Sequence, residues 1–551
     1  MQDHEMEQGM DMGSFEKKGK RFSRREVLVG GLAGAAAVAL GVGTASSAGA
    51  AALRSGGSDL RRATRATRRA SKAGQTITWG LSAYPTSFNP FENKGLTAGE
   101  LTTATHRGLL AYDQHGNLVP ALATSVTAVG DLRYEIQLRS GVQFHNGASL
   151  TSRDVAFTLD AMKEPSLAAS LSDYAEEIQS ISIESDDTLV LTLTAPDASL
   201  PSYLGTPYMP IISQKSDLAS GNFIGCGPFT VTSSEEGASI TCTAFDAYYK
   251  QGYPLAPAIH FETLAESASA VEALASGEVD IVDDLEWADF KSVQSNRNLR
   301  LLAHGGPFMY LVFNTKKEPC SSPQVRHAIG YAINRALVIA DAFYGTGSPL
   351  LGPPMPPSSP YFNSGYANSW SYDASKTKDL LAKAGYPHGI SVTLLSNAQY
   401  SYYTDIAVIL ESNLSAAGID VSLDLPDWAT QETDGISGDY DIAVMGSAGE
   451  VNDPSFLSLF LQGPPAFQRS FGFNSTQVND LLAKGLRLST VAERKPVYDQ
   501  IQELMIEQAP IVPLIWRDQA YGARSNVSGF ANLPGFLTFY SGYTLEQTSL
   551  V

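Results

Sequence analysis

The chain has 551 residues, of which 43% are hydrophobic, 9% aromatic and 17% charged, and this composition excludes a largely disordered protein. Its length exceeds what a single hydrophobic core ordinarily supports, so two or three domains are expected. The formal net charge is −19, and the charges are unevenly distributed along the chain. Residues 1–72 contain 13 Lys and Arg and 7 Asp and Glu, whereas residues 73–551 contain 25 Lys and Arg and 50 Asp and Glu. Such an acidic body argues against nucleic acid as the main partner, because phosphate binding needs positive charge.

The N-terminus has the features of an export signal. Arg24 and Arg25 stand directly before a run of Gly, Ala, Val and Leu over residues 29–42. A twin arginine before a short apolar core resembles a Tat-type signal peptide, which we assign to residues 1–50. Val27 departs from that pattern, since Phe is more usual there. The alternative is a chance arginine pair ahead of a buried helix.

A basic segment follows the predicted signal. Residues 51–74 are rich in Arg, Ser and Ala, and this composition predicts a disordered linker. No cysteine lies near the predicted cleavage region, so no lipobox cysteine for a lipid anchor is expected. The protein is therefore expected in the periplasm, or at the cell envelope or its extracellular face.

The most regular part of the chain lies between residues 133 and 159. Tyr134, Ile136 and Leu138 alternate with polar residues, which predicts a half-buried strand. The pair Asn146-Gly147 supplies the backbone of a tight turn. Thr151 and Asp154 then resemble a capping box at the start of an apolar helical face, although Asp replaces the usual Glu or Gln.

Strands and helices alternate along the rest of the chain, with antiparallel hairpins between them, and this order predicts α/β lobes. Residues 178–194 form a hairpin pattern around the turn at Ser185, Asp186 and Asp187. The other expected elements are strands at 75–81, 310–315 and 509–514 and helices at 271–276, 323–335, 372–385 and 498–507.

These motifs, taken in chain order, resemble the family 5 solute-binding proteins, the peptide and nickel receptors of ABC importers. Residues 138–159 resemble the family block "LRxGVxFHdGxpLtaxDVxFtl", and residues 225–229 resemble "GTGPY", with Cys226 in the Thr position. Residues 372–389 are close to "YDpxkAkxLLaeAGyPdG". The resemblance covers nearly the whole chain after the predicted signal.

The resemblance implies a two-lobed, periplasmic-binding-protein-like α/β fold (class II type, cluster C) with an extra subdomain and a hinge. Lobe I would comprise residues 75–105, 216–305 and 516–551. The extra subdomain, domain II of the family, would comprise residues 106–215. Lobe II, the family's domain III, would comprise residues 306–515.

The resemblance also implies where a ligand is bound. Residues 438–454 correspond to a segment that ends in "D-x-x-(D/E)-P" in peptide receptors, and its first acid pairs with the peptide's α-ammonium group. Glu450 occupies that first position and Asp453 the second. A carboxylate in a closing cleft favours a cation through charge-assisted hydrogen bonds. Glu450 could also be an ordinary solvated loop acid.

Aromatic side chains are further candidates. Trp428 matches a family tryptophan that packs on ligand side chains, and a large, rigid, half-polar ring suits a cleft wall. Tyr84, Phe88 and Trp287 are weaker candidates. Each of these four could instead pack in a core.

Two positions depart from the peptide-binding pattern. Some oligopeptide receptors have Arg at the position of Val444 and Trp at the position of Ser447. The Arg helps to hold a peptide carboxylate, and that positive partner is missing here. Ser447 stays a candidate ligand contact, and binding of free dipeptides is in doubt.

The sequence contains no recognisable catalytic or metal-binding motif. The eight histidines are scattered singly, and the HExxH, GxSxG, Walker A and SxxK patterns do not occur. No cofactor and no metal are therefore expected, and the protein is not expected to be an enzyme. Of the three cysteines, Cys226 and Cys242 flank a predicted hairpin and could form a disulfide in an exported protein.

The function that these inferences favour is delivery of a peptide-like or other cationic solute to an ABC importer. The lobes would close on the solute about a hinge, and the membrane permease would recognise the closed form. A monomer is expected. One alternative keeps the fold but binds an oligosaccharide or a metal chelate. A remote alternative is an exported hydrolase, and a third is a receptor that signals without transport.

Overall fold

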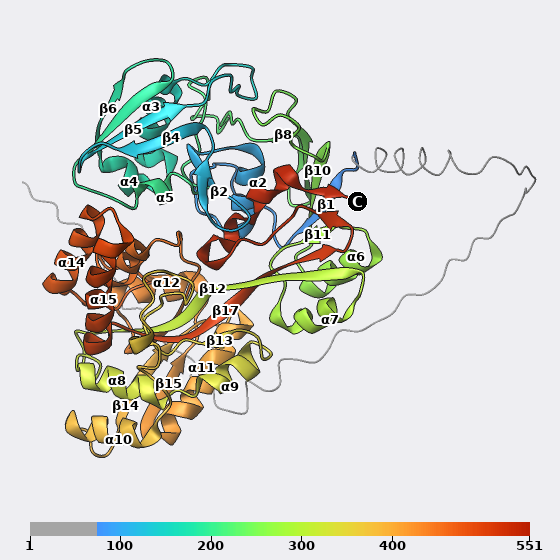
Figure 1. The fold of residues 1–551 in the computed structure, drawn as a ribbon. Coiled ribbons are helices and arrows are strands. Elements are labelled where there is room, and N and C mark those ends of the chain that lie inside the picture. The colour runs from blue at the N-terminus through green and yellow to red at the C-terminus, as the bar shows by residue number, and fades with distance from the viewer. Residues whose placement is uncertain (1–73) are drawn as a thin grey trace, which may run out of the picture. The chain divides into compact units, whose positions relative to one another are not determined.

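The computed structural model describes residues 74–551, and its main element is an 11-stranded sheet (Figure 1). The strand order is β15-β14-β16-β12-β17-β11-β1-β10-β9-β8, with β13 paired to β17. The long strands β12 (Leu299–Phe313) and β17 (Ile511–Arg524) lie in the middle of this order. The predicted signal peptide, residues 1–50, and the linker, apart from residue 74, lie outside the described residues.

The predicted lobe I contains one end of the sheet. Strand β1 pairs in parallel with β10 and β11. Strand β9 pairs antiparallel with β10 on one side and with β8 on the other. The elements of this lobe are β1 (Ile77–Leu81), α2 (Leu96–Thr105), β8 (Phe229–Glu235), β9 (Ser239–Ala244), β10 (Ala258–Thr263), α6 (Ser267–Ser276), β11 (Ile281–Val282), η2 (Trp287–Asp289), α7 (Phe290–Ser295), β18 (Val527–Ser528), η6 (Gly535–Gln547) and β19 (Ser549–Leu550).

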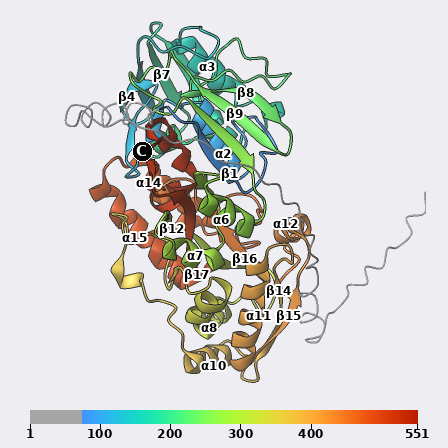
Figure 2. The same ribbon diagram turned by 90° about the vertical axis from the view of Figure 1, so that its right-hand side faces the viewer.

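Lobe II holds the other end, where β14 pairs in parallel with β15 and β16. Figure 2 shows α8, α10 and α11 gathered around these strands. Its elements are α8 (Pro323–Ala332), α9 (Arg335–Leu337), η3 (Val338–Ala342), β13 (Ser348–Pro349), η4 (Ser364–Tyr366), α10 (Ala374–Lys383), β14 (Ile390–Leu395), α11 (Ser401–Ala416), β15 (Ile419–Asp424), α12 (Trp428–Ser437), β16 (Ile442–Ser447), η5 (Pro454–Leu457), α13 (Ser458–Leu461), α14 (Thr476–Arg487) and α15 (Val491–Gln508).

Strands β12 and β17 connect the two lobes as an antiparallel ribbon. They pair from Leu299 opposite Arg524 to Val312 opposite Ile511, so one half lies beside β11 and the other beside β16. The register shifts between Gly305 and Phe308. Such an irregularity bends a strand pair locally. The predicted boundary between lobe I and lobe II, after residue 305, falls on this bend.

The extra subdomain has its own antiparallel sheet, in the order β4-β5-β7-β6. The predicted hairpin over residues 178–194 is confirmed as β6 and β7. Its elements are β2 (Leu110–Tyr112), β3 (Leu118–Pro120), β4 (Ala123–Ala128), β5 (Arg133–Leu138), α3 (Ser152–Ala161), η1 (Pro165–Leu167), α4 (Ser172–Glu176), β6 (Ile178–Ile183), β7 (Thr188–Leu193) and α5 (Leu200–Tyr203).

The predicted capping box is confirmed at the start of α3. The Thr151 backbone N–H donates to Asp154 Oδ2 at 2.9 Å, so Asp performs the role usually taken by Glu or Gln. The predicted turn is also present, since Gly147 has a φ of +79°. The turn and the capping box are each formed by residues within a few positions of one another, which explains why these two patterns could be read from sequence.

All three cysteines are buried free thiols, so the possible disulfide does not form. Cys226 packs with Leu109 and Phe144 in the core of the extra subdomain. Cys242 packs with Trp79 and Phe261 in the core of lobe I. The two thiols belong to different cores, and a disulfide needs its β-carbons about 4 Å apart.

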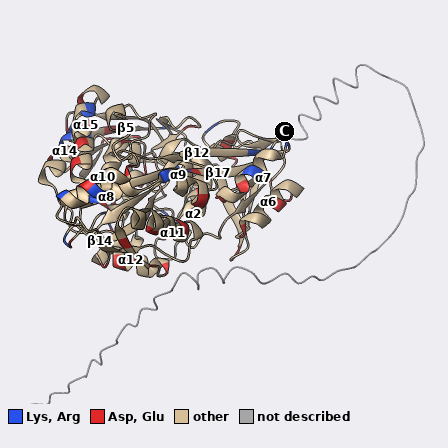
Figure 3. Ribbon diagram, turned by 90° about the horizontal axis from the view of Figure 1, so that it is seen from below, with Lys and Arg blue, Asp and Glu red and all other residues tan. Residues whose placement is uncertain are grey.

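Charged residues of both signs are interspersed along the helices on the face seen in Figure 3, for example on α14 and α15. Among the described residues, no helix combines the length and the apolar character that a membrane span requires.

Candidate solute-binding site

Glu450 lines a cavity of about 310 Å³ between the extra subdomain and lobe II. The two parts meet directly at its edge, where the Ala198 N–H donates to the Leu486 carbonyl at 2.8 Å. In Figure 1, α4 and α5 of the extra subdomain lie above α14 of lobe II. The polar side chains that line the cavity are Ser170, Asp173, Tyr174, Glu177, Asp197, Ser199, Glu450, Ser455, Ser458, Gln462, Arg469 and Tyr498.

The loop after β16 carries Glu450 into this cavity. Gly449 adopts a φ of +67°, and Phe536 leaves no room for a β-carbon there, so this bend requires glycine. Tyr540 donates its hydroxyl to the Glu450 carbonyl at 2.7 Å and holds the loop in place. No described residue forms a hydrogen bond or ion pair with the Glu450 carboxylate. Burial raises the pKa of this carboxyl to about 7.

Three acidic residues of the extra subdomain share the cavity with Glu450. Asp173 lies in α4, Glu177 follows α4, and Asp197 precedes α5. Burial, with Asp197 and Asp173 nearby, raises the pKa of Glu177 to about 7. The sequence analysis missed these residues because isolated acids in short helices and loops have no local signature.

Asp453, the second predicted acid, is engaged in a buried ion pair. Arg494 donates to both of its carboxylate oxygens, at 2.7 and 2.8 Å. Asp453 also caps η5, since Oδ1 accepts from the Ser455 N–H at 2.9 Å. Asp453 does not line the cavity around Glu450. A ligand contact at Asp453 would have to share oxygens that are already hydrogen-bonded.

Ser447 and Trp428 lie in lobe II but outside the lining of that cavity. Ser447 ends β16 and accepts a hydrogen bond from the Gly449 N–H at 3.1 Å. Trp428 begins α12 and meets Tyr400 and Phe467 edge-on, with ring centroids 5.7 and 5.9 Å away. Trp428 therefore belongs to an aromatic cluster that covers the core of lobe II.

Trp287 reaches from lobe I to lobe II. Its ring meets Phe343 at 4.7 Å and Tyr402 at 5.3 Å between centroids, both edge-on. Its Nε1–H donates to the Asp518 carbonyl in β17 at 2.8 Å. Tyr84, in contrast, lies half-buried at the core of lobe I, with Phe88 6.1 Å away.

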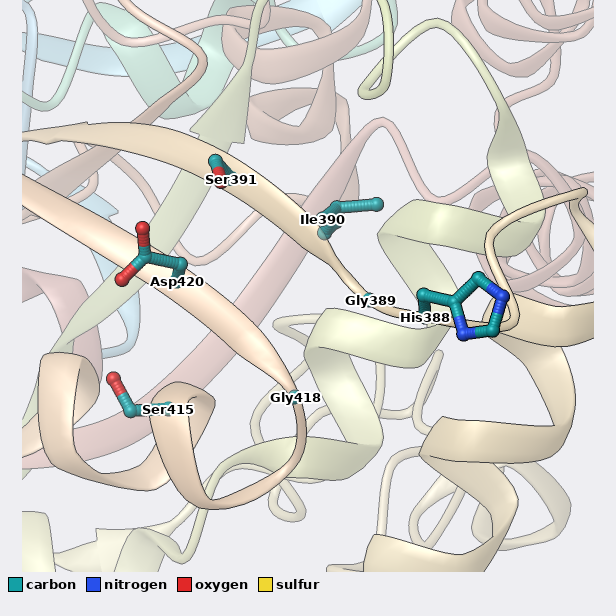
Figure 4. Close-up of a pocket in the computed structure, with 7 residues that line it drawn as sticks. All are labelled: His388, Gly389, Ile390, Ser391, Ser415, Gly418 and Asp420. Atoms are coloured by element: carbon teal, nitrogen blue, oxygen red, sulfur yellow. The ribbon is translucent and has the colours of Figure 1, made fainter.

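Another hollow lies at the opposite end of lobe II from the Glu450 loop, where β14 and β15 begin. Figure 4 shows its lining, with the His388 ring at one side and the Asp420 carboxylate at the other. These groups point in different directions, so the hollow offers no convergent set of ligand contacts. Nowhere in residues 74–551 do three or more His, Cys, Asp or Glu side chains gather in a way that could hold a metal ion.

Comparison with known proteins gives a family match and close structural relatives. Residues 117–468 match the family described as bacterial extracellular solute-binding proteins, family 5 Middle. The glutathione-binding protein GsiB of Escherichia coli O6:K15:H31 is 25% identical over 496 residues, which span 87% of this chain and 95% of GsiB.

Two solved structures align over most of the chain. The binding protein AgaA of A. tumefaciens R10, in complex with agropinic acid, is 37% identical with a TM-score of 0.77, covering 87% of this chain and 99% of AgaA. DppA of Helicobacter pylori, in complex with the peptide STSA, is 24% identical with a TM-score of 0.74, covering 88% and 99%. The second likeness shows the fold alone. The predicted two-lobed fold is confirmed, and the chain belongs to the family 5 bacterial extracellular solute-binding proteins.

Proposed function

We propose that this protein captures a solute with a cationic group at Glu450 and delivers it to an ABC importer. The observation that carries the proposal is a half-buried carboxylate that lines a cavity and has no partner among the described residues. A cation placed there would regain the charge-assisted hydrogen bonds that Glu450 lacks. Glu450 also occupies the family position that pairs with an α-ammonium group.

Solute capture would proceed by closure of the lobes about the β12–β17 ribbon, with the bend at Gly305–Phe308 as the hinge. The membrane permease would then recognise the closed form. We further propose a monomer that is exported by a Tat-type signal to the periplasm or cell envelope and that has no catalytic activity. Family membership supports the binding role and the place outside the cytoplasm, since the named relatives are binding proteins and the family is described as extracellular. Contacts from Trp428, Ser447, Asp453, Tyr84 and Trp287 to the solute remain predictions.

Thermal shift with a library of peptides, amines, sugars and metal chelates tests the function. A saturating rise in Tm with an amine-bearing solute is expected, because a ligand that binds the folded state stabilises it. The variant Glu450→Gln should weaken that binding by about tenfold or more. Glu432→Gln is the matched control, since Glu432 is an exposed acid on α12. Equal affinities of Glu450→Gln and the native protein would refute the role of Glu450.

A second candidate is an acidic solute, and one observation favours it. AgaA, which is 37% identical to this chain, binds agropinic acid in its structure. Arg469 lines the cavity here, and its buried Nε has no hydrogen-bond partner among the described residues. This candidate predicts that agropinic acid raises Tm and that Arg469→Gln abolishes the rise. An unchanged Tm with agropinic acid would eliminate it.

A further inference from the structure

We propose that the cavity around Glu450 accommodates a solute with two cationic groups, one bound by Glu450 of lobe II and the other by Asp197 and Glu177 of the extra subdomain. This inference rests on the proposed function and specifies its substrate class. A short diamine is the simplest solute of this kind.

The charge of the cavity wall is the first argument. Four carboxylates line it, from Asp173, Glu177, Asp197 and Glu450, against one guanidinium among the described lining residues, that of Arg469. Arg469 donates from Nη1 to the Gln462 carbonyl and forms no ion pair with any described residue. The acids of this wall therefore lack protein counter-ions inside the cavity.

Asp197 gives the second, independent argument. Its side chain lines the cavity although the residue is only 3% exposed. Oδ1 accepts from the Ser199 N–H at 2.8 Å and from the Ser199 hydroxyl at 2.6 Å. Oδ2 is buried and has no hydrogen-bond partner among residues 74–551. A buried carboxylate oxygen without a donor costs free energy, and an ammonium group in the cavity would satisfy it.

Glu177 and Asp197 together form the acidic group of the extra subdomain, which we call the second acidic pole; Glu450 is the first. No described residue donates a hydrogen bond to the Glu177 carboxylate, and Asp197 and Asp173 act on it by electrostatic repulsion. Because these acids repel one another, burial and repulsion raise the pKa of Glu177 to about 7. A cation placed between Glu177 and the two aspartates would attract all three carboxylates and offset their repulsion. Arg494, which also lies near Asp197, is already paired with Asp453.

The size of the site favours a small solute. A volume of about 310 Å³ is at the lower end of the range for ligand pockets. Tyr174 and Tyr498 line part of the cavity with their aromatic rings. The Tyr174 ring stacks on Tyr203, with 3.8 Å between the ring centroids. The two acidic poles belong to different parts of the fold. A dication would therefore link the extra subdomain to lobe II.

Calorimetric titration of the native protein with 1,3-diaminopropane, 1,4-diaminobutane and 1,5-diaminopentane tests the inference. Propylamine, butylamine and pentylamine are the matched monoamines. At least one diamine should bind about tenfold more tightly than its monoamine, because the second charge gains its own partners. The variants Glu177→Gln and Asp197→Asn should reduce this preference by about tenfold. Glu176→Gln, one residue away on the exposed face of α4, should change nothing.

The outcomes separate this inference from the proposed function. Equal affinities for diamines and monoamines, or an unchanged preference in Glu177→Gln, would overturn the dication site. If Glu450→Gln still abolished amine binding in that case, the proposed function would stand. Absence of saturable binding by every amine would overturn both. Glu177 is half-buried, so Glu177→Gln keeps the test decisive even if Asp197→Asn fails to fold.

Discussion

Arg494 donates from Nη1 and Nη2 to the two carboxylate oxygens of Asp453, at 2.7 and 2.8 Å. The side chains are 6% and 11% exposed, so this bidentate pair is almost completely buried. It joins the start of η5 to α15 directly behind the loop that carries Glu450. The acid that the family pattern predicts beside the ligand thus stabilises the loop that carries Glu450.

Loss of that pair should destabilise the protein. Asp453→Asn removes one charge and leaves the Arg494 guanidinium buried, which costs about 3 kcal/mol or more. Chemical denaturation of both proteins measures this free energy of unfolding. Asp186→Asn is the control, since Arg153 and Asp186 form an exposed pair in the extra subdomain, whose loss should cost less than about 1 kcal/mol. Equal stabilities of the two variants would contradict the structural role of Asp453.

Cation binding should depend on pH near neutrality. Because burial raises the pKa of Glu450 to about 7, this carboxylate is protonated in part at neutral pH and binds a cation only after ionisation. Glu177 has the same raised pKa of about 7, while Asp173, Asp197, Arg469 and the tyrosines complete the wall. Affinity for 1,4-diaminobutane should therefore fall by about tenfold or more from about pH 8 to about pH 6.

Calorimetry at several pH values measures that dependence. The slope of log Kd against pH should become shallower in Glu450→Gln and shallower again when Glu177→Gln is added. Glu432→Gln should keep the native slope. The same slope in all four proteins would show that neither cavity acid controls binding.

Protein stability should also vary with pH, through a different acid pair. Glu100 of α2 is fully buried, and burial together with the neighbouring Asp283 holds its pKa well above the usual value. Burial also raises the pKa of Asp283 to about 7, with Asp284 and Tyr521 nearby. The folded protein therefore keeps protons that the unfolded chain releases from about pH 4 upward. Stability should fall, by a few kcal/mol, as pH rises from about 4 to about 7.

The substitution Glu100→Gln tests this dependence. It removes one of the two acids while keeping its shape, so Tm should fall less between about pH 5 and about pH 8 than in the native protein. Differential scanning calorimetry across that range provides the measurement. Glu135→Gln, an exposed acid on β5, should follow the native curve. Parallel curves for all three proteins would refute the coupling.

Closure of the lobes should depend on Trp287. Its edge-on contacts with Phe343 and Tyr402 cross between the lobes, and each such pair contributes about 0.5–1.5 kcal/mol. Trp287→Ala should weaken solute binding by about tenfold and leave a larger radius of gyration in saturating solute, as measured by small-angle scattering. Tyr372→Ala is the control, because its ring is exposed on lobe II and no contact to the solute is predicted for it. Identical radii for both variants would exclude this role.

Local patterns were read correctly where neighbouring residues determine the structure. The turn at Gly147 and the capping box of Thr151 and Asp154 depend on residues within a few positions of one another. The strand Arg133–Leu138 shows its alternating pattern within its own residues, although it is held by pairing with β4 and β7. The hairpin of β6 and β7 was predictable for the same reason. The helix predicted at 498–507 extends in the structure over Val491–Gln508, because Thr490 and Glu493 form a second capping box that the sequence analysis overlooked.

Sites built by distant residues were read only in part. The family pattern located Glu450 on its loop, but it did not show that Asp453 forms an ion pair with Arg494. It also missed Glu177 and Asp197, which meet Glu450 only because the extra subdomain packs against lobe II. The disulfide that the sequence left open does not form, since proximity to one hairpin does not place Cys226 and Cys242 in one core.

The sequence by itself determined the family, the alternation of strands and helices, and the loop that holds Glu450, because periodicity and turn residues act over short stretches of chain. The tertiary structure decided which carboxylates share a cavity and which are already paired. Burial and counter-ions depend on packing between segments that are far apart in the chain. The acidic cavity, and with it the class of solute that we propose, therefore became visible only in the folded protein.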